Sequence, residues 1–151
     1  MSTVEGGGAD PLDDPGIPDS DALFRRLSDS GPSMVAVDLE TGERRPTSGA
    51  FKPDDDGVSV FRRGLLLAAG LGPDDVIKHP WNLVVSVDVG DVRSIGLGAR
   101  DDPWPSDIDE PEHPRNAAHA LIVGLERLGR NERRRRQKAL VALPSVIFVR
   151  G

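Results

Sequence analysis

The chain has 151 residues and a formal net charge of −6 at pH 7, and it contains no cysteine. The length is typical of one domain with a single hydrophobic core, and the acidic balance argues against a protein governed by attraction to nucleic acid or anionic membranes. The longest apolar run, LLLAAGL at 65–71, is far shorter than the roughly 20 residues that cross a bilayer. We therefore expect a soluble cytoplasmic protein without disulfides or thiolate metal sites. The excess of arginine over lysine and the abundance of Asp, Gly and Pro are typical of high-GC coding, so we expect a bacterial source.

The first 18 residues combine glycine, proline and carboxylates with almost no regularly spaced apolar side chains. Such a segment cannot bury enough surface to offset its ordering entropy. We therefore expect a disordered tail at 1–18 and a single domain at 19–151. The domain begins with DSDALFRRL at 19–27, where capping side chains precede apolar residues at helical spacing, and this predicts a short helix.

The middle of the chain carries short strand and helix patterns. The sequences MVAVDL at 34–39 and GVSVF at 57–61 each predict a strand. Ser59 lacks the GxSxG elbow of a hydrolase nucleophile and is interpreted as an ordinary strand serine. Leucine and alanine at 64–70 predict a helix, and a proline then permits a further helical turn at 74–78.

The strongest strand signal is LVVSVDVGDVRSIGL at 83–97. The Gly90-Asp91 pair can close a two-residue hairpin, in which Asp88 would lie opposite Arg93. One long strand with a glycine bulge is the alternative. The hairpin is favoured because its turn chemistry and its facing charges agree.

Two helices and a strand are predicted at the C-terminal end. Pro114 suits the first turn of a helix with His113 or a nearby residue as its cap, and apolar side chains then recur at helical spacing as far as a terminating glycine. A second helix runs from Asn131 to Leu143, and SVIFV at 145–149 predicts a strand within the sheet rather than at an exposed edge. The predicted fold is α+β, with a mainly antiparallel sheet of four or five short strands packed against the two C-terminal helices.

On the first of these helices, Arg115, His119 and Glu126 would lie along one edge of the apolar stripe. His119 can act as a general acid or base near neutral pH, Arg115 could bind an anion, and a carboxylate such as Glu126 could orient the ring. One hypothesis is therefore a small enzyme acting on an anionic or nucleotide-like substrate. The competing interpretation is a boundary histidine that covers the edge of the core.

Two segments near the C-terminal end carry opposite charges. DDPWPSDIDEPE at 101–112 is acidic, and RNERRRRQK at 130–138 is basic. Helical geometry turns Arg133 and Arg136 toward the protein. A buried guanidinium needs a partner, and the acidic segment could supply it. The alternative is a phosphate or nucleic-acid surface made from the outward cations, which are Arg130, Arg134, Arg135 and Lys138.

The other hypothesis for function is a small accessory protein that binds another protein. Its binding face would combine Trp104 of the acidic segment and the adjacent His113 with Arg133 and Arg136. Nucleic acid is not the expected partner, since no nucleic-acid motif accompanies the arginines and aromatic residues are few. No cofactor is expected, and no metal is expected because the histidines do not have the spacing of a helical zinc site.

Overall fold

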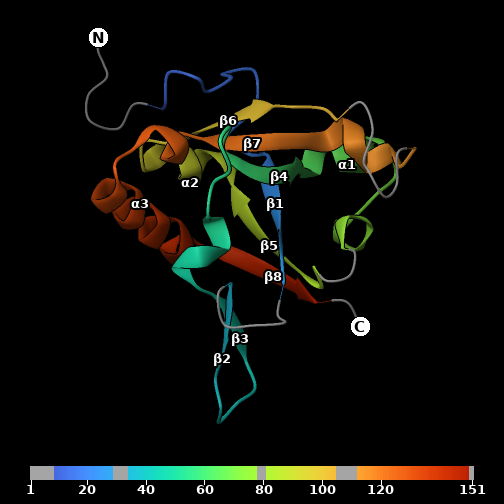
Figure 1. The fold of residues 1–151 in the computed structure, drawn as a ribbon. Coiled ribbons are helices and arrows are strands. Elements are labelled where there is room, and N and C mark those ends of the chain that lie inside the picture. Colours follow the sequence, from blue (N-terminus) through green and yellow to red (C-terminus); the bar gives the residue numbers. More distant parts are fainter. Residues whose placement is uncertain (1–8, 29–33, 78–80, 105–111, 150–151) are drawn as a thin grey trace.

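The computed structural model describes residues 9–28, 34–77, 81–104 and 112–149. Its centre is a six-stranded antiparallel sheet with the order β6-β7-β4-β1-β5-β8 (Figure 1). The strands of this sheet are β1 (Ala22–Leu27), β4 (Val58–Arg62), β5 (Leu83–Asp88), β6 (Gly98–Asp101), β7 (His119–Val123) and β8 (Ser145–Val149). A two-stranded ribbon, β2 (Val35–Val37) and β3 (Arg44–Pro46), projects from the body of the molecule.

The helical elements are short except for one. Over the described ranges the structure has three α-helices and four 3₁₀ helices. These are α1 (Arg63–Ala68), α2 (Val89–Ser94), α3 (Arg130–Ala142), η1 (Ser48–Phe51), η2 (Pro73–Val76), η3 (Pro114–Ala118) and η4 (Leu125–Arg127). The α+β class and the antiparallel sheet are confirmed, but the sheet has six strands rather than four or five, and only one long C-terminal helix packs against it.

Both faces of the sheet are covered, and each has its own apolar cluster. One cluster joins the sheet to α2, α3 and η1, through Val92, Leu140 and Phe51. The other joins it to α1 and η2, through Leu66 and Val76. Because successive side chains of a strand point to opposite faces, a strand in the middle of this sheet is apolar on both sides.

This two-sided burial explains why the helix predicted at 19–27 is wrong. The segment forms β1, a central strand between β4 and β5. Leu23 and Leu27 face one apolar cluster, whereas Phe24 faces the other. A strand buried on both faces loses the alternation of polar and apolar residues, and its short apolar pattern resembles a helix.

The hairpin predicted at 83–97 is also wrong. The first half forms β5, but the chain then enters α2 instead of turning back. The amide of Gly90 donates to the carbonyl of Asp19 at 3.0 Å. Asp88 pairs with Ala22 of β1, and Arg93 binds Asp13 and Asp19. Contacts distant in sequence therefore replace the local turn.

The long helix predicted from Pro114 is the third correction. Pro114 does begin a helix that His113 caps, since His113 Nδ1 accepts a hydrogen bond from the amide of Arg115, but this helix is η3 and ends at residue 118. The chain then forms β7, whose five residues are all buried. Gly124 adopts a φ of 125° at the end of the strand, a conformation that favours glycine.

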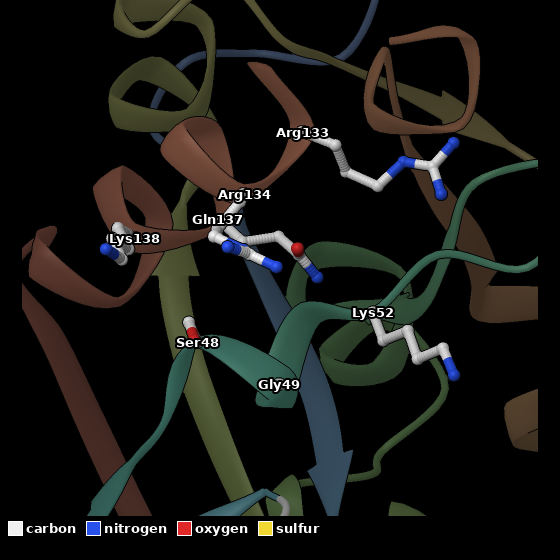
Figure 2. Close-up of a pocket in the computed structure, with 7 residues that line it drawn as sticks. All are labelled: Ser48, Gly49, Lys52, Arg133, Arg134, Gln137 and Lys138. Atoms are coloured by element: carbon white, nitrogen blue, oxygen red, sulfur yellow. The ribbon is translucent and has the colours of Figure 1, made fainter. Parts of the chain in front are cut away.

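Several other predictions are confirmed. The predicted elements at 34–39, 57–61, 64–70 and 131–143 correspond to β2, β4, α1 and α3, and η2 supplies the helical turn predicted at 74–78 as far as residue 76. The strand predicted at 145–149 is present as β8, but among the described strands it lies at the edge of the sheet, paired with β5. Figure 2 shows α3 lying across η1, against which it packs.

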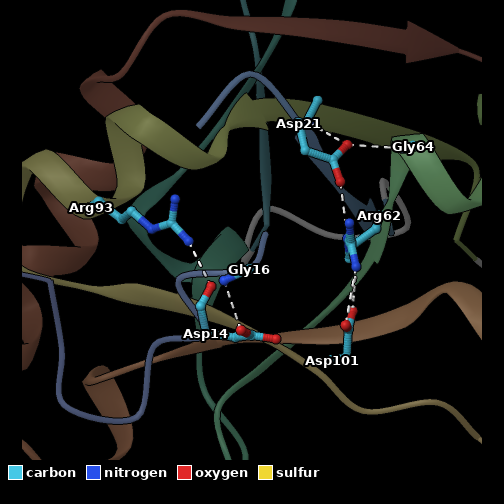
Figure 3. Close-up of polar contacts among 8 residues, drawn as sticks. Asp14, Gly16, Asp21, Arg62, Gly64, Arg93 and Asp101 are labelled. Carbon is cyan, nitrogen blue, oxygen red and sulfur yellow. Dashed lines mark hydrogen bonds and ion pairs between the residues drawn. The ribbon is translucent and has the colours of Figure 1, made fainter. Parts of the chain in front are cut away.

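Residues 9–18 of the predicted tail belong to the described part of the chain, whereas 1–8 lie outside it. They run beside β6, where the amide of Asp14 donates to the carbonyl of Ala99 at 2.8 Å, and Ile17 is buried in the core. Arg93 of α2 holds this segment through the carbonyl of Asp14 (Figure 3). The single-domain boundary at 19–151 stays a prediction.

A polar cluster of Asp21, Arg62 and Asp101 joins three parts of the sheet. Asp21 is buried, and its carboxylate accepts hydrogen bonds from the amides of Ala22 and Gly64, each at 2.8 Å. Arg62 then bridges Asp21 and Asp101, with N–O distances of 2.9 and 2.8 Å (Figure 3). The cluster fixes the start of β1, the end of β4 and the end of β6 relative to one another.

Candidate functional site

Two neighbouring strands bring Ser59 and His119 together. On β4, Val58 and Val60 face the cluster beneath α3, so Ser59 points to the opposite face. On β7, Ala120 and Ile122 face the same cluster, so His119 also points away from it. In the antiparallel register Ser59 pairs with Leu121, which places His119 diagonally across from Ser59. The hydroxyl Oγ of Ser59 lies 2.6 Å from Nε2 of His119.

The other nitrogen of His119 contacts Asp102, which follows β6. Nδ1 lies 2.8 Å from the backbone carbonyl oxygen of Asp102 and 3.3 Å from its carboxylate. Because both groups are acceptors, Nδ1 carries the proton and donates it to them. Nε2 is then left with its lone pair, which accepts the hydroxyl proton of Ser59. The three residues thus form a hydrogen-bonded line from a hydroxyl through an imidazole to the backbone carbonyl of Asp102, with the Asp102 carboxylate 3.3 Å from Nδ1.

Aromatic side chains enclose the imidazole. The ring of Trp104 stacks on His119 with a centroid distance of 3.9 Å, and the ring of Phe61 meets it edge-on at 5.5 Å. His119 is only 2% exposed. This burial lowers the pKa of His119 below its ordinary value, and the hydrogen bond to the Asp102 carbonyl only partly opposes the effect. The imidazole is therefore neutral at pH 7 and available as a base.

A hollow of about 180 Å³ opens beside the serine and the histidine. The residues that line it are Asp54, Asp56, Gly57, Ser59, Asp102, Trp104, His119 and Leu121. Three of them are carboxylates, and Leu121 and Trp104 add apolar surface. Such a hollow favours a neutral or cationic ligand over an anionic one.

The backbone around Ser59 is held in place from two sides. Gly57 has a φ of 137°, and a Cβ added there would lie 2.6 Å from the carbonyl oxygen of Ile122, so β4 and β7 approach closely at this point. Arg25 of β1 donates to the carbonyl of Ser59 at 3.0 Å and to that of Ala50 at 2.9 Å. These contacts fix the serine with respect to the histidine.

The structure separates Arg115 from His119. Arg115 lies in η3, is buried, and contacts the carbonyl of Asp75 in η2 at 3.4 Å. It is not among the described residues that line the hollow beside His119. His113 serves as the cap of η3. The two residues position η3 instead of flanking the imidazole along a helix.

Glu126 also lies apart from the imidazole. Its carboxylate accepts a hydrogen bond from the amide of Gly124 at 2.9 Å and pairs with Arg127. It lines a neighbouring hollow together with Asp102. The carboxylate that contacts the His119 ring is Asp102 instead.

Arg133 and Arg136 reach into the protein, as helical geometry predicts. Arg133 donates to the carbonyl of Leu125 at 3.1 Å, and Arg136 donates to that of Ile95 at 2.7 Å. Arg136 also pairs with Glu132, one turn earlier in α3. The partners found for these arginines are therefore backbone carbonyls and a carboxylate of their own helix, rather than the described part of the acidic segment.

The protein-binding face proposed from the sequence stays a prediction. Residues 105–111 of the acidic segment lie outside the described residues. Trp104 is half-buried and packs on Phe61, on the sheet face opposite α3. Arg133 and Arg136 lie on the α3 side of the sheet, so the structure does not bring Trp104 and these arginines together.

Sequence reasoning missed Ser59 and Asp102 as members of the site. Ser59 sits in a plain strand pattern without a nucleophile elbow, and Asp102 is one carboxylate among many in its segment. No local motif joins them to His119. Only the register of β4, β7 and β6 does so, and that register depends on contacts distant in sequence.

Comparisons with protein-family models, curated proteins and solved structures found no match to this chain. Within the described ranges, no three His, Cys, Asp or Glu side chains are placed so that they could hold a metal ion together. In the same part of the chain, no helix has the length and apolar character needed to cross a bilayer. The expected bacterial source and cytoplasmic location stay predictions.

Proposed function

We propose that this protein is a small hydrolase that transfers an acyl group to water through Ser59. Ser59 Oγ is the nucleophile, His119 Nε2 is the general base, and Asp102 orients the ring. The single observation that carries the proposal is the 2.6 Å contact between Ser59 Oγ and His119 Nε2 beside a hollow. The proposal keeps the expected role of His119 as an acid or base. The partners of His119 are now Ser59 and Asp102 in place of Arg115 and Glu126.

The protonation state of His119 supports this role. A general base must hold a free lone pair next to the proton that it removes. The Nδ1 contacts to Asp102 place the ring proton on Nδ1, and burial lowers the pKa of His119. Nε2 is therefore unprotonated at pH 7, with the Ser59 hydroxyl proton directed at it.

The reaction follows from these positions. Ser59 Oγ bonds to the carbonyl carbon of an ester as its proton passes to Nε2. The bond from that carbon to the leaving oxygen then breaks, and the imidazolium returns the proton to the departing alkoxide. Water attacks the acyl-serine with the same base, which releases the acid and restores the hydroxyl.

The lining of the hollow indicates the class of substrate. Carboxylates of Asp54, Asp56 and Asp102 repel an anionic substrate, and Leu121 and Trp104 add apolar surface. A volume of about 180 Å³ suits a short acyl chain. We therefore propose neutral or cationic short-chain esters as substrates, in place of the anionic ones expected from Arg115.

Covalent labelling with an uncharged alkyl fluorophosphonate tests the proposal. Intact mass and peptide mapping should find one adduct, located on Ser59, in the wild-type protein. Ser59→Ala should abolish labelling, and His119→Gln should slow it at least about 100-fold. The matched control is Ser86→Ala, since Ser86 is a half-buried serine of β5 away from the histidine.

Ester hydrolysis provides the second readout. A short-chain p-nitrophenyl ester should be turned over by the wild-type protein and the Ser86→Ala variant, and not by Ser59→Ala. Circular dichroism of each variant verifies that it is folded. Labelling that persists in folded Ser59→Ala, or an unlabelled wild-type protein, would overturn the proposal.

A further inference from the structure

A second hollow, of about 310 Å³, lies between α3 and η1 on the sheet face opposite Ser59. The residues lining it are Ser48, Gly49, Lys52, Arg133, Arg134, Gln137 and Lys138 (Figure 2). Four of these residues are cations, and no carboxylate is present among the described residues that line it. In a chain with a net charge of −6, this is a local concentration of positive charge.

The fold explains how the cations gather there. Leu140 is buried beneath α3 and packs in the same cluster as Phe51 of η1. The hollow forms along the edge of this contact. Arg134 and Lys138 are four residues apart on α3, so they project from the same side of the helix. Both are exposed, and Figure 2 shows Arg134 beside Gln137, with Ser48 of η1 nearby.

The charge at this edge is not neutralised within the helix. Glu132 pairs with Arg135 and Arg136, and neither of these arginines lines the hollow. Arg133 is held by the carbonyls of Leu125 and Leu128, which carry no formal charge. Like charges at i and i+4 repel one another, so an anion between them would relieve the repulsion.

We propose that this hollow binds a small molecule through its phosphoryl groups. A phosphoryl group concentrates negative charge and presents several acceptor oxygens. Arginine and lysine donate to it through charge-assisted hydrogen bonds, and the hydroxyl of Ser48 adds a neutral donor. The size of the hollow suits a small ligand, and the described residues that line it include no aromatic ring on which a nucleic-acid base could stack.

Titration calorimetry with inorganic pyrophosphate tests the proposal. The wild-type protein should bind it saturably, with an affinity that falls as salt is added. The double variant Arg134→Gln/Lys138→Gln should weaken binding at least about tenfold, because two charge-assisted contacts are lost. The matched control is Arg130→Gln/Arg135→Gln, which removes the same charge from exposed positions of α3 outside the hollow.

The control variant should bind pyrophosphate within about twofold of the wild-type protein. Equal weakening in the two double variants would assign the binding to the general charge of α3 and overturn the proposal. A wild-type protein that binds no pyrophosphate, or that binds single-stranded RNA through Arg134 and Lys138 but no pyrophosphate, would overturn it as well. The replaced side chains are exposed, so the fold should persist in both variants. Labelling of Ser59 is a separate readout and does not depend on this outcome.

Discussion

Ser59 Oγ and His119 Nε2 lie 2.6 Å apart, although their residues are 60 positions apart in the chain. The contact runs diagonally across β4 and β7, and Asp102 holds the far side of the ring. Both ring nitrogens therefore have partners in a buried setting. This arrangement keeps the imidazole neutral, and it directs the one lone pair of the ring at a hydroxyl.

Stability should depend on pH through His119. Burial lowers the pKa of His119 in the folded protein, whereas the unfolded chain has the ordinary value near 6.5. Below that unfolded value the unfolded chain binds the proton more readily than the folded protein does. The contribution of His119 to stability is therefore complete above the unfolded pKa and is lost as the pH drops through the folded pKa. Thermal unfolding at about pH 7.5 and about pH 5.5 should show a lower melting temperature at the acidic pH. His119→Gln, which retains the other two histidines, should show a smaller difference; an equal difference would assign the effect to other groups.

Gly57 should not tolerate a side chain. Its φ of 137° strains any L-residue, and an added Cβ would lie 2.6 Å from the carbonyl oxygen of Ile122. Gly57→Ala should lower the free energy of unfolding by about 2 to 3 kcal/mol, as measured by urea denaturation. Gly72→Ala is the control, since Gly72 has a φ of −132° and its Cβ would meet nothing within 4 Å. Similar losses in the two variants would contradict this account of the β4–β7 approach.

The two carboxylates bound to Arg62 should contribute unequally. The side chain of Asp21 is 4% exposed and also accepts two backbone amides, whereas that of Asp101 is 39% exposed. Asp21→Ala should cost about 3 kcal/mol, because it leaves buried donors without an acceptor. Asp101→Ala should cost about 1 kcal/mol or less. Chemical denaturation of both variants measures the difference, and equal costs would refute the ranking.

Arg93 should keep residues 13–19 packed against the rest of the protein. Its guanidinium binds the carboxylates of Asp13 and Asp19, at 3.0 and 2.6 Å, and the carbonyl of Asp14 at 2.8 Å. Arg93→Met should speed hydrogen exchange at the amide of Ile17 about tenfold, since local opening becomes easier. Mass spectrometry of exchanged peptides measures the rate. Arg100→Met, at an exposed position of β6, should leave it unchanged, and protection that survives in Arg93→Met would show that the segment is held by other contacts.

The last helix could be predicted because its signals are local. The helix at 131–143 follows from its composition and from the proline that ends it, and it matches α3. Helical geometry alone also turned Arg133 and Arg136 inward, as their contacts with backbone carbonyls confirm. Their partners could not be predicted, because every residue has a backbone carbonyl and the sequence does not show which ones lie within reach.

By itself, the sequence determined the α+β class, the long helix α3, and the short strands whose apolar pattern is flanked by turn residues. Only the tertiary structure decided that β1 and β7 are central strands, because burial on both faces removes the alternation that identifies a strand. It also decided the site: Ser59, His119 and Asp102 meet through strand register. Register depends on which face of each strand is buried by elements distant in sequence.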